Sequence, residues 1–205
     1  GNGWFYKMDE HYTFKFPEFM PPNPNPYKPF GEELVLAVEV MITYVDGTME
    51  VIHADEDFLV KEHPVVMSNV YGSETIDGRK NQDGWCTAGF NATSWENASI
   101  VTKEKEPTGR MIDQIQPPVK VLHSYQGEYL NNVQSKDIYD FTQNMSGILE
   151  FEVKGKVGDA IHLYPAEKLT KNGDVDQMAK GWVNLDSCIT YIIGQDDVWE
   201  TCRMK

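Results

Sequence analysis

The chain has 205 residues with 32 acidic and 18 basic side chains, which gives a formal net charge of -14 at pH 7. A field of this sign repels phosphate backbones and anionic lipid headgroups, so nucleic acid and the membrane surface are excluded as expected partners. No apolar run in the sequence reaches the roughly 18 to 20 residues that a membrane-spanning helix needs. The length suffices for one large or two ordinary domains, and we expect two.

The first third of the chain has a proline-rich segment followed by a strand pattern. Residues 16–29 contain six prolines without periodicity, which predicts an extended insertion at the surface. Residues 34–44 and 48–53 are mostly apolar or alternating and flank Asp46-Gly47, which predicts a β-hairpin with positive φ in its turn. Residues 34–53 therefore indicate antiparallel β-structure.

Similar short segments, rich in Val, Ile, Thr, Tyr and Phe, recur to the end of the chain, for example at residues 147–153 and 160–164. No window has a long apolar stripe at helical spacing, so we expect an all-β fold with at most one or two short helical turns, the first choice being residues 93–97. Polar residues around Gly127 separate two strand-rich regions. We therefore predict two β-sandwich domains in series, residues 1–124 and 125–205.

Three cysteines, Cys86, Cys188 and Cys202, are present without a C-x-x-C spacing, which argues against the usual zinc and thioredoxin sites. Cys188 and Cys202 could face each other across a hairpin. Free thiols on strands are the favoured interpretation.

Several sequence blocks occur in a fixed order along the chain: SNVYGSETIDGR at 68–79, GFNATSWENA at 89–98, GRMIDQIQPPVKV at 109–121, and a block at 138–169 that contains DFTQN and AEKL. This series resembles the amino-terminal β-domains of the bacterial α-L-rhamnosidases, glycoside hydrolase family 78. The opening GNGWFY is similar to a strand that precedes these blocks in the family. Asn69, which stands where the family usually has Asp, is one departure from the pattern.

The resemblance implies a jelly-roll-like first domain, with residues 16–29 as an insertion, and a second, truncated sandwich. It also implies that catalysis resides in an (α/α)6 barrel elsewhere in a longer polypeptide, which would be secreted or periplasmic in a bacterium. Inverting hydrolysis needs two carboxyl groups about 6.5 to 9.5 Å apart on a shaped sugar pocket. We expect no catalytic residue in this chain, because its acidic runs, such as residues 55–57, are typical of solvated turns.

Residues 69–85 offer the groups that recognise a sugar, namely aromatic, amide, carboxylate and guanidinium side chains. The candidate sugar-binding residues are Asn69, Tyr71, Glu74, Asp77, Arg79 and Trp85. Related rhamnose-binding modules hold the sugar through calcium, for which Asn69 and Asp77 are weak candidate ligands. The structural interpretation is favoured: Glu74 and Arg79 would pair with each other, and Trp85 would fill the core.

In the second region, residues 140–144 (DFTQN) are expected to form a turn whose polar side chains bond the backbone; a polar site is the alternative. Glu167, near the end of a predicted strand, is a candidate for contact with the catalytic barrel, as the resemblance implies. No metal or other cofactor is expected apart from a possible calcium ion.

Three functions are compatible with these features. The favoured one is a non-catalytic accessory region of an α-L-rhamnosidase, which supports the barrel and helps to present a rhamnose-containing glycan. The second is an autonomous rhamnose-binding module that could depend on calcium. The third, a pure interaction domain of the same sandwich class, depends on fold analogy alone.

Overall fold

The computed structural model describes residues 35–69, 73–102, 112, 114–177 and 188–204. Within these ranges the regular structure is β-strand, apart from one short 3-10 helix at Gly78–Lys80. This confirms the predicted all-β class with little helix. No helix in the described part is long and apolar enough to cross a membrane. The proline-rich segment at residues 16–29 lies outside the described residues.

The predicted Asp-Gly hairpin is confirmed. β1 (Glu39–Thr43) pairs antiparallel with β2 (Met49–His53), with Thr43 opposite Met49. Gly47 has φ of 84°, the conformation that favours glycine in such a turn. The Asp46 carboxylate accepts hydrogen bonds from the backbone N–H and the hydroxyl of Thr48, at 2.9 and 2.7 Å, which fixes the turn.

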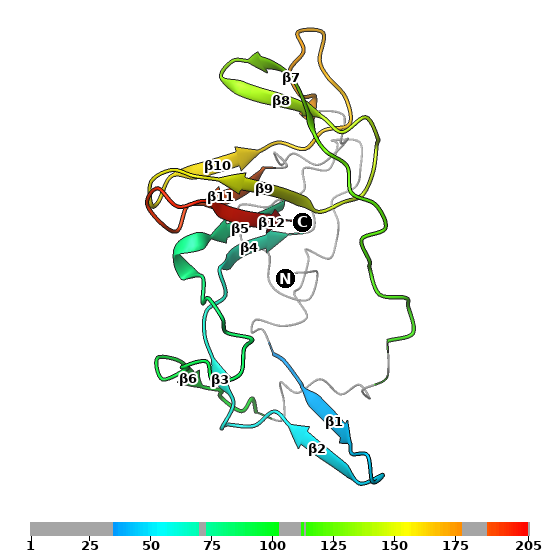
Figure 1. The fold of residues 1–205 in the computed structure, drawn as a ribbon, viewed down its shortest axis with the longest axis vertical. Coiled ribbons are helices and arrows are strands. Elements are labelled where there is room, and N and C mark those ends of the chain that lie inside the picture. Colours follow the sequence, from blue (N-terminus) through cyan, green and yellow to red (C-terminus); the bar gives the residue numbers. More distant parts are fainter. Residues whose placement is uncertain (1–34, 70–72, 103–111, 113, 178–187, 205) are drawn as a thin grey trace, which may run out of the picture.

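The largest sheet has four strands in the order β10-β11-β5-β4 (Figure 1). Its strands are β4 (Val65–Asn69), β5 (Ser73–Asp77), β10 (Ala160–Leu163) and β11 (Ile189–Ile192). β5 and β11 are parallel, with Ile76 opposite Tyr191, whereas the other two pairings are antiparallel. The sheet thus joins strands from both sides of the predicted boundary at residue 124; the boundary itself stays a prediction.

A second layer faces this sheet and completes a sandwich. β9 (Leu149–Val153) pairs antiparallel with β12 (Glu200–Met204), with Phe151 opposite Cys202. The buried side chains alternate along β11 and β12, as expected for strands with one face toward a core. The core cluster consists of Ile189, Tyr191, Ile193, Cys202 and Met204, packed against partly buried residues that include Ile76, Phe151 and Ile161. Strands β4, β5, β9, β10, β11 and β12 are called the sandwich below.

A close contact of two backbones locks the two halves of the chain together inside the sandwich. A Cβ added to Gly194 would lie 2.5 Å from the carbonyl oxygen of Gly78, and one added to Gly78 would lie 2.9 Å from the nitrogen of Gly194. Glu200 ties down the same region, because its carboxylate accepts from the Tyr191 hydroxyl at 2.5 Å and from the N–H groups of Gly194 and Gln195. Only glycine therefore fits at positions 78 and 194, where the two backbones cross.

The remaining strands are peripheral. β3 (Leu59–Val60) pairs with β6 (Glu96–Asn97), and β7 (Glu128–Val133) forms a hairpin with β8 (Lys136–Asp140). Figure 1 shows the β1–β2 and β7–β8 hairpins at opposite ends of the molecule, with the sandwich between them. These two are called the outer hairpins.

One local expectation is corrected by the structure. The helical turn predicted at residues 93–97 is wrong, because only a single turn closed by the Trp95 N–H on the Ala92 carbonyl is present, and Glu96–Asn97 then pairs with β3. The short helix lies instead at Gly78–Lys80, where Asp77 caps it. Strands at residues 149–153 and 160–163 are confirmed, although they pair with β12 and β11 and not with each other.

The three cysteines are free, as predicted. Cys202 is buried in the core, and this burial raises the pKa of its thiol to about 11. Cys86 is exposed.

Candidate functional site

Of the predicted sugar-binding residues that the structure describes, Glu74 and Asp77 lie in β5, and Arg79 and Trp85 lie in the segment that follows it. Glu74 and Asp77 are both buried strand residues, 9% and 6% exposed. Arg79 lies just after the strand, in the 3-10 helix, and Asn69 ends β4 opposite Ser73. Tyr71 and the side chain of Asn69 lie outside what the structure describes. The structure therefore brings Asp77 and Arg79 together at the end of β5.

Asp77 is fully engaged by Arg79. Its Oδ1 accepts from the Arg79 backbone N–H at 3.1 Å and from Nε at 2.8 Å, and its Oδ2 accepts from Nη2 at 2.8 Å. These hydrogen bonds from Arg79 hold the pKa of the Asp77 carboxyl below its ordinary value, and the pKa of Arg79 is raised in return. The guanidinium thus pairs with Asp77, whereas the structural interpretation expected it to pair with Glu74. Asp77 therefore caps the 3-10 helix and also forms a bidentate ion pair with Arg79.

Trp85 is not a core residue. Its side chain is 60% exposed in a turn-rich segment, where its backbone N–H donates to the Gln82 carbonyl at 3.1 Å. The expectation that Trp85 fills the core is therefore wrong, because two turns in succession keep this segment at the surface. An exposed indole remains available for stacking, but the described interactions include no contact between it and the Asp77–Arg79 pair.

Asp77, one of the two candidate calcium ligands, is already engaged in an ion pair. Calcium requires six to eight oxygen ligands, and both oxygens of Asp77 already accept hydrogen bonds from Arg79. In the part of the chain that is described, no three His, Cys, Asp or Glu side chains are grouped so that they could hold a metal ion. Calcium would therefore compete with the Arg79 guanidinium for Asp77, and the calcium requirement stays a prediction.

A pocket of about 330 Å³ opens where the second half of the chain turns away from β8. It is lined by Tyr139, Asp140, Phe141, Thr142, Gln143, Asn144, Ala166 and Glu167. The first six residues run from the end of β8 into the following turn, and the other two follow β10. The DFTQN turn and Glu167, which the sequence analysis treated separately, therefore belong to one site.

The turn that forms the pocket has a defined backbone. The Asp140 carboxylate accepts from the Thr142 N–H at 2.8 Å, and Thr142 has φ of 58°, an uncommon value for a β-branched residue. The predicted turn at residues 140–144 is thus present, and its side chains also line a pocket. Next to it, a Cβ on Gly127 would lie 3.1 Å from Cζ of Phe141, so this ring packs tightly against the start of β7.

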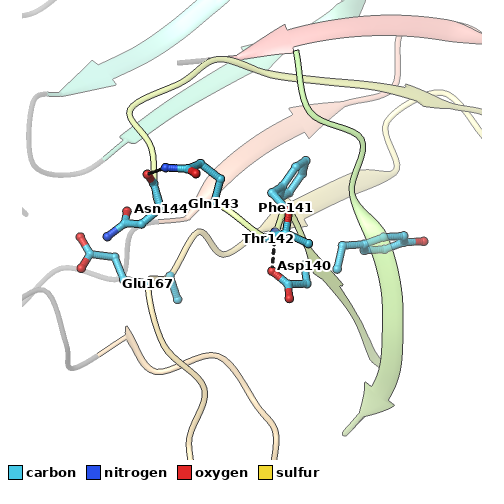
Figure 2. A pocket seen from close by; sticks show the side chains of 8 residues that line it. Asp140, Phe141, Thr142, Gln143, Asn144 and Glu167 are labelled. Carbon is cyan, nitrogen blue, oxygen red and sulfur yellow. Dashed lines mark hydrogen bonds between the residues drawn. The ribbon is translucent and has the colours of Figure 1, made fainter. Parts of the chain in front are cut away.

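The polar groups of the pocket lie on two sides of it (Figure 2). Asn144 and Glu167 lie together on one side, and Asp140 and Thr142 on the other. Among the described residues, Glu167 has no hydrogen-bond or ion-pair partner, and the lining includes two carboxylates but neither Lys nor Arg. The pocket therefore presents free hydrogen-bond acceptors together with amide donors.

An aromatic pair extends from the rim of the pocket along the β7–β8 hairpin. Tyr139 faces Tyr129 across the strands, with ring centroids 5.8 Å apart and an edge-to-face angle of 71°. Both rings are more than half exposed. Residue spacing did not reveal this site, because no sequence signal shows that residues 139–144 approach residues 166–167.

Four described carboxyl groups have a shifted pKa, and in each the pKa is lowered. A glycosidase acid needs a pKa raised above its usual range. Where the pKa of a described carboxyl group departs from its ordinary value, it is lowered by a hydrogen bond from a neighbour; these groups are Asp46, Glu62, Asp77 and Asp174. The described residues therefore offer binding groups and structural ion pairs.

The fold is that of a β-sandwich region, and two family models identify the class of protein to which it belongs. The model of the alpha-L-rhamnosidase N-terminal domain matches residues 1–123, and that of the bacterial alpha-L-rhamnosidase concanavalin-like domain matches residues 131–200. The chain belongs to the bacterial α-L-rhamnosidase family.

Individual relatives agree with this assignment. The chain is similar to an alpha-L-rhamnosidase of Streptomyces avermitilis, 26% identical over 147 residues that cover 71% of this chain, and to one of Formosa agariphila, 31% identical over 140 residues that cover 66%. Each match covers 14% of the relative, so the aligned part of the chain spans about a seventh of the length of these proteins.

Solved structures show the same fold. The alpha-L-rhamnosidase from Dictyoglumus thermophilum superposes with a TM-score of 0.72 at 24% identity, over 87% of this chain and 20% of that one. The Streptomyces avermitilis alpha-L-rhamnosidase complexed with L-rhamnose gives a TM-score of 0.57 at 23% identity, over 81% of this chain and 16% of that one. At sequence identities of 23 and 24%, this structural similarity concerns the fold alone.

Proposed function

We propose that this chain is a non-catalytic accessory region of a secreted α-L-rhamnosidase, which supports the catalytic barrel of the same polypeptide and helps to present a rhamnose-containing glycan. The observation that carries the proposal is the succession of the two family matches, which together take up nearly the whole chain, whereas the aligned part of the chain covers only 14% of each relative. Bond cleavage is assigned to the larger remainder.

The surface around Glu167 is the proposed contact with the catalytic part. Glu167 lies outside the sandwich and has no described partner, so it is available to another part of a longer chain. A carboxylate in such a position can accept a charge-assisted hydrogen bond from a facing domain. The sandwich behind it would supply a rigid support.

A hydrolysis assay tests the accessory role. The purified 205-residue chain and a full-length relative are incubated with p-nitrophenyl α-L-rhamnopyranoside, and the released p-nitrophenol is measured. We expect turnover by the relative and none above background by this chain. Release of L-rhamnose by this chain, at a rate proportional to its concentration and absent from a mock purification, would refute the proposal.

The calcium-dependent rhamnose-binding module remains the second candidate from the sequence. It is weakened by the Asp77–Arg79 pair, which occupies one of the two proposed ligands. Calorimetric titration with L-rhamnose in the presence of calcium, and again after chelation, decides the matter. Heat that disappears with the chelator would support this candidate.

A further inference from the structure

We propose that the pocket between the 140–144 turn and residues 166–167 is a subsite for one neutral sugar ring of a glycan. The proposal adds a ligand site to the accessory function above, and it concerns residues other than the 69–85 cluster that the sequence suggested. It assigns the Glu167 carboxylate to a sugar in place of the contact with the catalytic part, because one carboxylate does not serve both. The volume of about 330 Å³ is at the lower end of the range for small-molecule sites, which suits a single pyranose ring.

The first argument is the hydrogen-bonding chemistry of the lining. A sugar ring carries several hydroxyl groups, each of which donates one hydrogen bond and accepts others. The pocket offers carboxylate acceptors on Asp140 and Glu167 and the amide side chain of Asn144, which can donate and accept. Because these groups lie on two sides of the pocket, hydroxyls on opposite edges of one ring can be bound together (Figure 2).

The second argument is the aromatic rim. A pyranose also has an apolar C–H surface, which packs well against an exposed aromatic ring. Tyr139 belongs to the lining, is 54% exposed and is supported edge-on by Tyr129. A glycan that extends from the pocket could therefore continue along the β7–β8 hairpin.

The third argument concerns charge. Two carboxylates line the pocket, no lysine or arginine does, and the whole chain carries a net charge of -14. A uronic acid or a sulfated sugar would be repelled by this field, whereas a neutral hexose or deoxyhexose would not. The site thus selects neutral rings, among them L-rhamnose.

The fourth argument is preorganisation. The Asp140–Thr142 hydrogen bond sets the shape of the turn, and Phe141 anchors it against Gly127. Binding groups on a fixed backbone lose less conformational freedom when a ligand binds. A weak but specific single-sugar site is the result we expect.

Nuclear magnetic resonance titration of the isotope-labelled 205-residue chain tests the proposal with L-rhamnose and, as the charged comparison, D-glucuronate. We expect saturable shifts of the amide signals of residues 139–144 and 166–167 with L-rhamnose, and at least tenfold weaker binding of D-glucuronate. Asn144→Ala and Glu167→Ala should each weaken L-rhamnose binding about fivefold or more. The matched control is Glu56→Ala, an exposed glutamate outside the pocket, which should change nothing. The dispersion of each variant's spectrum verifies that it is folded.

Three results would overturn the proposal: no saturable shift with L-rhamnose, equal binding of D-glucuronate, or binding that is lost in Trp85→Ala and kept in both pocket variants. None of these would affect the proposed non-catalytic support of the barrel, which fails if the chain itself hydrolyses a rhamnoside. The two proposals can therefore fail separately.

Discussion

The sandwich and the outer hairpins solve the problem of β-sheet stability in different ways. In the sandwich, strands from both halves of the chain enclose a core in which Ile193 and Met204 are almost fully buried. In the β1–β2 hairpin, every residue except Ile42 is exposed, and the turn hydrogen bonds and strand pairing carry the structure. An isolated two-stranded hairpin is marginally stable at best. The comparison indicates that stability is concentrated in the sandwich, which leaves the β7–β8 end free to carry a binding surface.

The backbone crossing in the sandwich provides the largest expected effect. Gly194→Ala places a Cβ 2.5 Å from the Gly78 carbonyl oxygen, where only backbone could move, so we expect a loss of about 3 kcal/mol in the free energy of unfolding. Urea denaturation followed by tryptophan fluorescence measures it. Gly147→Ala is the control, since its nearest neighbours are side-chain atoms at 3.8 Å. Equal stability of the two variants would show that the halves are not locked at this crossing.

The second largest effect on stability is expected from the loss of the Glu200 carboxylate. Glu200→Ala leaves the Tyr191 hydroxyl and the N–H groups of Gly194 and Gln195 without their acceptor, which should cost roughly 2 kcal/mol. The same denaturation experiment applies, with Glu152→Ala, on the exposed side of β9, as the matched control. If the two glutamate variants unfold at the same urea concentration, Glu200 does not hold the turn between β11 and β12.

A pH dependence is expected from Asp77, at the boundary between the sandwich and the surface. The Arg79 hydrogen bonds lower the folded-state pKa of Asp77, so its stabilising contribution is present above the ordinary pKa of about 3.9 and is lost as the pH falls through the lower folded value. Asp77→Asn should cost about 1 to 2 kcal/mol at pH 7. Its free energy of unfolding should also depend less on pH below 4 than that of the unmodified chain; parallel curves for the two proteins would contradict the assignment.

The smallest effect is expected for an exposed ion pair. Lys156 and Asp197 are 2.5 Å apart, but both side chains are more than 60% exposed. Water and salt screen such a pair, so Lys156→Ala should change the free energy of unfolding by less than about 0.5 kcal/mol. A loss above 1 kcal/mol in thermal or urea denaturation would mean that this surface is more tightly organised than the comparison suggests.

The local parts of this structure could be predicted from the sequence, and the long-range parts could not. Asp46-Gly47 specified its hairpin, because the turn conformation is a property of those two residues. Strand pairing between β5 and β11 carries no such signal, since neither segment determines its partner. The same holds for the site: the turn at residues 140–144 was foreseeable from its side chains, whereas its meeting with Glu167 depends on the path of the whole chain.

The parallel pairing of β5 with β11 also has a consequence for biosynthesis. β5 is made early, yet its neighbour in the sheet is made only after residue 189 has been translated. The edge of β5 that pairs with β11 therefore stays unpaired while most of the remaining sequence leaves the ribosome. Contacts between segments far apart in the sequence slow folding, and an unpaired strand edge favours association between chains. The acidic character of the chain, which keeps copies apart, would protect it during that interval.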